Sequence, residues 1–148
     1  MPRLIYVDSG VLLAAARGVD EIAHRMARTS GQGAFAVLDD PDAQFASSIF
    51  VKLELLPKAI YNRRSAEGQF YETYFAATDA WAEPTPQLAQ TAFDIATMFG
   101  LSAMDALHVA AAIAVDAEEV VTSERASSPL LRVRMLSVRT IHPTDAKN

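Results

Sequence analysis

Short apolar runs and longer amphipathic stretches alternate along the chain, and this alternation predicts strands that alternate with helices. The predicted strands are short, mostly apolar segments at residues 4–7, 44–49, 78–83, 119–122 and 133–138. The predicted helices carry apolar positions at helical spacing and cover residues 11–17, 20–28, 50–62, 65–78, 86–99 and 104–117. Such an alternation indicates an α/β fold with a parallel sheet covered by helices on both faces.

Capping residues, glycine and proline set the expected boundaries of these elements. Ser9 is a suitable cap for the first helix, and Gly18 is placed to close it. Residues 30–33 predict a turn, whereas residues 34–38 predict either a strand or a short buried turn. Pro57 lies inside a predicted helix and lacks a backbone N–H, so it predicts a bend or a break there.

The composition limits the class of protein. With 148 residues, 51% of them hydrophobic and 21% charged, the chain is expected to form one domain over residues 1–148. The longest apolar run is too short to span a membrane, and the amino terminus lacks a secretory cleavage site, which predicts a soluble, cytoplasmic protein. The chain has no cysteine, and its three histidines lack ligand spacing. A bound metal would therefore be held by oxygen atoms.

Four acidic residues lie far apart in the chain, each where a strand should end or a helix should begin: Asp8, Glu54, Asp105 and Glu124. In a parallel sheet the carboxyl ends of the strands share one edge, so these side chains are expected to meet there. Clustered carboxylates repel one another unless a divalent cation neutralises them. The pattern predicts a magnesium or manganese site that orients water and stabilises charge on a phosphodiester.

Two of the four acids also have a structural interpretation. Asp105 stands three residues after Ser102, which is the spacing of a capping box at a helix start. Glu54 stands between Lys52 and Lys58, a spacing compatible with a salt bridge on the surface of a helix. Taken singly, each of these acids is more typical of a structural role.

The remaining candidates differ in how strongly they indicate function. Asp8 follows a buried strand directly and would lose hydration unless a polar partner meets it, which favours a functional role. Glu124 is uninformative alone, and His108 is more typical of a buried structural histidine than of a proton carrier. The hydroxyls of Ser9 and Thr122 could contact substrate, but helix capping and strand-end hydrogen bonds explain them equally well.

The charge balance argues against a protein that coats nucleic acid. The net charge is −5, and such binding normally needs a basic surface. Basic residues do cluster locally at Lys58, Arg63 and Arg64, as they do at residues 132–139. These groups are either contacts to an RNA backbone or solvated and partner-facing surface.

Other chemistries built on an aspartate after a strand fit less well. A haloacid-dehalogenase-like phosphatase needs a second aspartate where this chain has Gly10, and a receiver domain needs an acidic pair and a late lysine that are missing. The glycine-rich phosphate-binding motifs GxxxxGK[ST] and GxGxxG do not occur either. The oxygen-ligated metal site therefore remains the leading interpretation.

The ordered segments IYVDSGVLLA, SSIFVKLELLPKA, LSAMDALHVAAA and VVTSER together resemble the PIN-domain family, and most of all its VapC-type toxins. The resemblance covers nearly the whole chain and implies a three-layer α/β/α fold around a parallel sheet. It implies a Mg²⁺- or Mn²⁺-dependent endoribonuclease in which Asp8, Glu54 and Asp105 match the first three acids of the family. Asp8 and Asp105 would bind the metal, and Glu124 would complete the pocket. An RNA substrate, a cognate antitoxin and a homodimer are also implied.

Two positions depart from the family pattern. Gly10 replaces the usual asparagine of the first motif, and Glu124 replaces the usual fourth aspartate. The extra methylene of Glu124 moves its carboxylate by about 1.5 Å, and shifts of that size affect rate. The alternative is a weakly active or non-catalytic PIN-like module that binds RNA or protein. A DNase or flap-type nuclease is disfavoured because the chain lacks the extra helices and acids that grip duplex ends.

Overall fold

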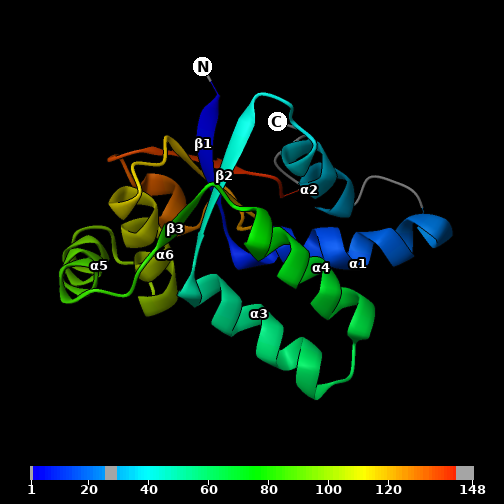
Figure 1. Cartoon of the computed structure of the whole chain (residues 1–148). Helices are drawn as coiled ribbons and strands as arrows, with labels where there is room; N and C mark the ends of the chain where they lie inside the picture. The colour runs from blue at the N-terminus through cyan, green and yellow to red at the C-terminus, as the bar shows by residue number, and fades with distance from the viewer. Residues whose placement is uncertain (1, 26–29, 143–148) are drawn as a thin grey trace.

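The computed structural model describes residues 2–25 and 30–142, with side chains described outside residues 19–32. Its centre is a five-stranded, fully parallel sheet in the order β3-β2-β1-β4-β5 (Figure 1). The strands are β1 (Arg3–Val7), β2 (Ala43–Ser48), β3 (Ala80–Ala82), β4 (Glu119–Thr122) and β5 (Ser137–Thr140). The strand order reverses at β1, because β2 and β3 follow on one side of β1, and β4 and β5 follow on its other side.

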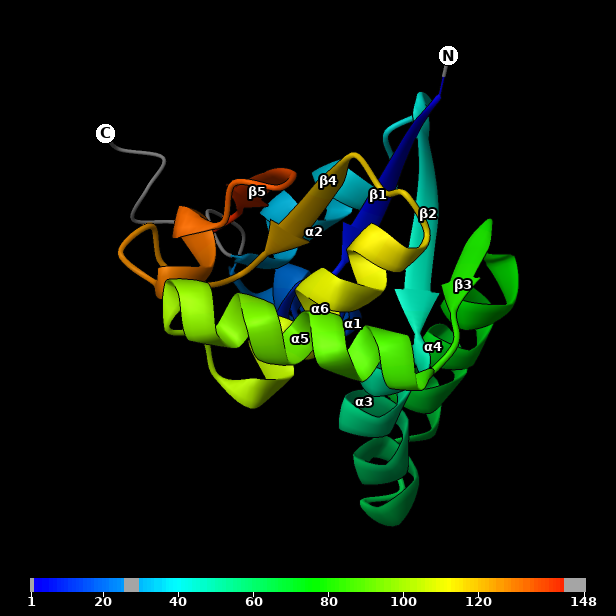
Figure 2. The same cartoon turned by 90° about the vertical axis from the view of Figure 1, so that its left-hand side faces the viewer.

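Helices cover both faces of the sheet, which confirms the predicted three-layer α/β/α architecture. One face carries α1 (Ser9–Arg25), α2 (Ser30–Leu38) and α4 (Ser65–Ala77), and the other carries α5 (Pro86–Phe99) and α6 (Ala103–Ala114) (Figure 1). Helix α3 (Ile49–Tyr61) starts at the carboxyl end of β2 and projects below the sheet as a hairpin with α4 (Figure 2). A short 3₁₀ helix, η1 (Pro129–Arg132), precedes β5.

The central strands are buried on both faces, which explains their continuous apolar sequences. Ile5, Tyr6 and Val7 of β1 are completely buried, so side chains on both sides of the strand face packed helices. Helix α6 buries mostly alanines, whose small side chains let its backbone lie close to the sheet. Each buried branched aliphatic side chain contributes roughly 1.5–3 kcal/mol to folding.

The amino-terminal helices differ from the prediction. Helix α1 continues through Gly18 to Arg25, and the separate helix expected over 20–28 merges with it as far as the described residues extend. Residues 30–38 form α2, so the predicted turn and the strand-or-turn interpretation are wrong. Packing decides both cases: α1 and α2 bury an apolar face against each other and the sheet, which outweighs local glycine preferences.

Two further expectations are corrected by the structure. Helix α3 is continuous across Pro57, so of the expected bend or break the break is absent. Pro57 and Leu53 are both exposed, and the carbonyl that loses its helical partner can bind water. The last strand starts at Ser137 rather than at residue 133, because the buried Val133 ends the 3₁₀ helix η1, where its backbone N–H donates to the carbonyl of Leu130. In the described parts of the chain no helix is long and apolar enough to cross a membrane.

Candidate acidic site at the sheet edge

The carboxyl ends of β1 and β4 meet where the strand order reverses, which is where ligands bind in open α/β sheets. Val7 pairs with Val121, and the backbone N–H of Asp8 donates to the carbonyl of Val121 at 3.0 Å. Asp8 therefore leaves β1 directly beside Thr122, the last residue of β4. The strand pairing brings the first and fourth acidic motifs to one edge of the sheet.

Asp8 is the most deeply buried of the four acids, with 7% of its surface exposed. Its Oδ1 accepts a hydrogen bond from the backbone N–H of Val11 at 3.2 Å, and the Thr122 hydroxyl also bonds to the carboxylate. Burial raises the pKa of Asp8 from 3.8 to about 6, although these two hydrogen bonds lower it, and the charge of Asp105 adds to the rise. The carboxylate is held in a place where its charge is poorly solvated.

Asp105 lies in the first turn of α6, where the hydroxyl of Ser102 accepts its backbone N–H at 3.3 Å. The helix cap that the spacing predicts is thus present, but the Asp105 side chain also interacts with the other acids. Burial raises the pKa of Asp105, and the charge of Glu124 raises it further, with a smaller effect from Glu54. Asp105 is therefore electrostatically coupled to the other acids of this edge.

Glu54 lies within α3, and its carboxylate is held by neighbours from two other elements. Its Oε1 accepts a hydrogen bond from the Ser9 hydroxyl and lies 2.7 Å from His108 Nε2. The hydrogen bond from His108 has the largest effect and lowers the pKa of Glu54, with a further contribution from Ser9. Within the described part of the chain Glu54 forms a hydrogen bond with His108 and no salt bridge with Lys52 or Lys58, so the interpretation as a surface salt bridge is wrong.

Glu124 is exposed, and hydrogen bonds hold both its side chain and its backbone. Its Oε1 accepts a hydrogen bond from Ser128 at 3.0 Å, and its backbone N–H donates to Thr122 Oγ1 at 3.0 Å. The hydroxyl of Thr140 on β5 donates to its carbonyl. Glu124 thus stands at the outer margin of the acidic edge, close enough for its charge to raise the pKa of Asp105.

The chemistry of this donor set fits a hard divalent cation. Burial and neighbouring charge raise the pKa of both Asp8 and Asp105, and a cation among the acids would offset that repulsion. Carboxylate oxygens are the ligands that magnesium and manganese prefer. Among the described residues no three acidic or histidine side chains are already arranged around one metal position. A magnesium ion at this edge would be held by one or two of these carboxylates together with water.

A family model described as PIN domain matches residues 5–128. The chain belongs to the PIN-domain family. No curated protein matches the sequence. The similar solved structures share the fold at low sequence identity, and several are toxin–antitoxin complexes.

The VapBC2 crystal structure from Rickettsia felis, bound to a promoter DNA fragment, contains a chain 12% identical to this PIN domain. The TM-score is 0.66, and the match covers 93% of this chain and 98% of that one. A toxin–antitoxin complex from Klebsiella pneumoniae gives 16% identity and a TM-score of 0.65, with coverage of 93% and 98%. DNA-bound VapBC from Salmonella typhimurium gives 13% identity and a TM-score of 0.58, with coverage of 95% and 99%.

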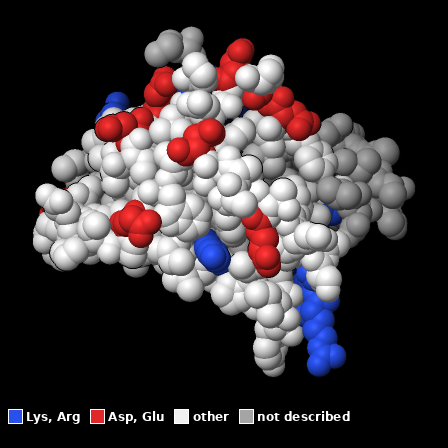
Figure 3. Space-filling model, in the orientation of Figure 1, with Lys and Arg blue, Asp and Glu red and all other residues white. Residues whose placement is uncertain are grey.

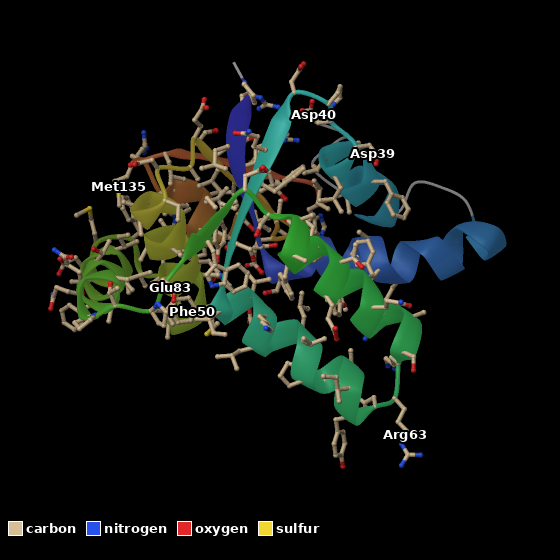
Figure 4. All side chains as sticks on the ribbon, viewed as in Figure 1. Asp39, Asp40, Phe50, Arg63, Glu83 and Met135 are labelled. Carbon is tan, nitrogen blue, oxygen red and sulfur yellow. The ribbon has the colours of Figure 1, made fainter. Side chains whose placement is uncertain are left out.

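The basic residues of this PIN domain do not all gather at the acidic edge. Arg63 and Arg64 lie beyond the end of α3, where they line a pocket of about 570 Å³. Arg63 points into solvent at the end of the α3–α4 hairpin (Figure 4). Basic side chains are visible at this end of the molecule in Figure 3. At 1.5 Å per residue, the end of α3 at Tyr61 is about 10 Å along the helix from Glu54, and Arg63 lies beyond it. Lys58 is closer, and its charge lowers the pKa of Glu54.

The structure adds one residue to the site that the sequence analysis missed. Tyr6 lies in the middle of β1, completely buried, and its hydroxyl hydrogen-bonds to His108 Nδ1 at 2.8 Å. The available signal was a tyrosine inside a strand buried on both faces, because a buried phenol needs a polar partner. His108 itself is buried, as expected, but both of its ring nitrogens have partners in the acidic site or beside it.

Gly10 has a steric explanation in this structure. A Cβ atom on residue 10 would lie 2.0 Å from Ser123 Oγ and 3.1 Å from Ser123 Cβ. The side chain of Ser123, between Thr122 and Glu124, therefore fills the space that a side chain at position 10 would occupy. The packing of the Ser123 side chain in this structure therefore depends on glycine at position 10.

Replacing Gly10 with alanine is expected to destabilise the protein by about 1–3 kcal/mol, because the new methyl group overpacks against Ser123. Gly68→Ala is the matched control, since its Cβ would meet its nearest neighbour at 3.8 Å and alanine favours the helix. Thermal unfolding of the two variants measures the difference. Adding Ser123→Ala to Gly10→Ala should restore part of the loss, and equal stability of the two single variants would contradict this explanation.

Proposed function

We propose that this PIN domain is a magnesium- or manganese-dependent endoribonuclease and the toxin of a toxin–antitoxin pair. The observation that carries the proposal is the coupling of Asp8 and Asp105 at the point where the strand order reverses. Burial and acidic neighbours hold the pKa of both groups above the usual range, and a divalent cation would relieve this repulsion. RNA is the substrate class favoured by the resemblance to VapC-type toxins.

The residues of the site divide the work in this proposal. Asp8 and Asp105 hold the metal, and Glu54 and Glu124 complete the acidic pocket. The bound ion supplies water activation and stabilises charge on the phosphodiester. Thr122 and the backbone N–H of Val11 orient Asp8, as their hydrogen bonds to its carboxylate indicate.

Substrate contacts come from two sets of residues. Lys58, Arg63 and Arg64 lie along and beyond one helix and would bind RNA phosphates, giving affinity without sequence preference. Ser9 and Thr122 were expected to offer hydroxyls to substrate, and that role stays a prediction. In the structure both hydroxyls bond to carboxylates, which supports a role in orienting Glu54 and Asp8.

The proposed partners follow from the family and from the similar structures. The VapBC structures from Rickettsia felis and Salmonella typhimurium and the Klebsiella pneumoniae toxin–antitoxin complex support a cognate antitoxin for this chain. A homodimer, a cytoplasmic location and a single domain over residues 1–148 stay predictions.

A manganese titration tests the function. We expect the parent protein to bind Mn²⁺ in calorimetry and to cleave structured RNA, with activity lost in chelator and restored by added metal. Asp105→Asn should weaken Mn²⁺ binding about tenfold or more. Asp94→Asn is the matched control, because Asp94 is an exposed carboxylate on α5 that accepts a hydrogen bond from Gln90 and lies outside the four acids of the site. A parent protein that cleaves equally well in chelator would refute the proposal.

The second candidate is a non-catalytic PIN module that binds RNA or protein. It is favoured by one feature: Glu124 is exposed and bonded to Ser128, so the acids are not arranged as a ready-made metal site within the described residues. This candidate predicts RNA binding that is independent of metal and is followed by no cleavage. Gel-shift and cleavage assays on the same RNA, with and without Mn²⁺, separate the two functions.

A further inference from the structure

A line of buried hydrogen bonds runs from the interior of the sheet to the acidic edge. The Tyr6 hydroxyl lies 2.7 Å from Ser48 Oγ on one side and 2.8 Å from His108 Nδ1 on the other. His108 Nε2 then lies 2.7 Å from Glu54 Oε1, which also accepts a hydrogen bond from Ser9. The line links β1, β2, α6 and α3, and it ends on one of the four acids.

Counting donors and acceptors gives the direction of this line. Hydrogen bonds from His108 and Ser9 lower the pKa of Glu54, so its carboxylate is ionised and can only accept. His108 Nε2 must therefore carry a hydrogen and donate it. With a neutral ring, Nδ1 accepts from the Tyr6 hydroxyl, whose oxygen accepts from Ser48. The Ser48 oxygen in turn accepts the backbone N–H of Phe50 at 3.2 Å, which also caps α3.

The arrangement exceeds what a structural histidine needs. His108 and Tyr6 are almost completely buried, with 5% and 0% of their surfaces exposed, whereas the Glu54 side chain is 35% exposed. A flexible glutamate on a helix would ordinarily sample several rotamers. Here the His108 ring, held at Nδ1 by Tyr6, contacts Glu54 through Nε2 from the core. Buried hydrogen-bond networks in which every member has a partner are rigid.

We propose that Tyr6 and His108 are positioning residues that hold the Glu54 carboxylate toward Asp8 and Asp105. This inference rests on the proposed function. Tyr6 orients the imidazole, and the imidazole donates from Nε2 to Oε1 of Glu54, the oxygen that also accepts the Ser9 hydroxyl. Outer partners of metal-site carboxylates act in this way, and their loss costs about 10- to 100-fold in metal affinity or activity.

Two substitutions of His108 separate positioning from packing. The amide of glutamine reaches the place of Nε2 and can still donate to Glu54, whereas the amide of asparagine reaches only the place of Nδ1 and keeps the contact with Tyr6. We expect His108→Asn to lower Mn²⁺ affinity and kcat/KM about 10- to 100-fold. His108→Gln should stay within a few-fold of the parent in both. Thermal unfolding of the two variants records any general loss of packing.

The second arm removes the phenol that orients the ring. Tyr6→Phe keeps the buried ring and deletes only the hydroxyl, and Tyr71→Phe is the matched control. Tyr71 is also completely buried and bonds to a glutamate, Glu67, at 2.9 Å, but it lies on α4 away from the acidic edge. Nitrogen NMR should show His108 protonated at Nε2 in the parent and in Tyr71→Phe. Tyr6→Phe should keep the hydrogen on Nε2, because Glu54 still accepts it, but it removes the donor to Nδ1 and should give a weaker Mn²⁺ affinity.

Each outcome decides the inference. A His108 ring with a bare Nε2 in the parent would overturn it, without any assay of cleavage. Equal losses of Mn²⁺ affinity in His108→Asn and His108→Gln, in step with their stability, would reduce the residue to a packing role and also overturn it. If the parent binds Mn²⁺ but cleaves no RNA, the proposed function fails. The protonation of Nε2 and the difference between the two variants in Mn²⁺ affinity would then still support positioning.

Discussion

Asp8→Asn is expected to abolish RNA cleavage while making the metal-free protein more stable. A metal ligand supplies several kcal/mol of stabilisation to a charged transition state, so its loss should lower the rate roughly a thousandfold or more. The rise in the pKa of Asp8 from 3.8 to about 6 corresponds to a destabilisation on the order of 3 kcal/mol at neutral pH. Asparagine carries no charge there and can still accept the N–H of Val11.

Cleavage assays and chemical denaturation in chelator measure the two halves of this prediction. The control is Asp39→Asn, because Asp39 is an exposed carboxylate just ahead of β2, at the opposite edge of the sheet (Figure 4). It should leave both quantities unchanged. An Asp8→Asn variant that is inactive but less stable than the parent would mean that the carboxylate is needed for folding. Full activity would remove Asp8 from the site.

The metal-free protein is also expected to lose stability as the pH rises through the range from about 4 to about 6. Below the unfolded pKa of 3.8 Asp8 is protonated in both states, and above about 6 it is ionised in both. Between these values the folded state binds more protons, so stability falls with pH, by up to about 3 kcal/mol. The raised pKa of Asp105 acts in the same direction. The lowered pKa of Glu54 acts oppositely and contributes stability that is lost as the pH falls.

Urea denaturation across this range, in chelator, measures the dependence. Asp8→Asn should flatten the curve, because it removes the group with the largest effect. Added Mg²⁺ or Mn²⁺ should stabilise the parent most at the upper end, since the ion binds the charged carboxylates of the folded state. A parent curve as flat as that of the variant would mean that Asp8 titrates normally.

Local sequence patterns were sufficient for most of the sheet. β1 and β4 lie where continuous apolar runs predict them, because strands buried on both faces have apolar residues at successive positions. The region of residues 30–38 was unpredictable for the opposite reason. Its two glycines disfavour a helix, and packing against α1 outweighs that local preference.

The site was predictable only in part. The order of strands and acids in the sequence places Asp8 and Asp105 near one another, and the charge of Asp105, which raises the pKa of Asp8, agrees with that. The partners of these acids depend on packing between elements distant in sequence. Neither the link from Tyr6 to His108 nor the fit of Gly10 against Ser123 follows from spacing along the chain.

The dispersal of the acids over β1, α3, α6 and the end of β4 also bears on biosynthesis. Contacts between residues so far apart in sequence cannot form until the chain between them has been synthesised. A ribosome must therefore release nearly the entire polypeptide before the last carboxylate can join the others.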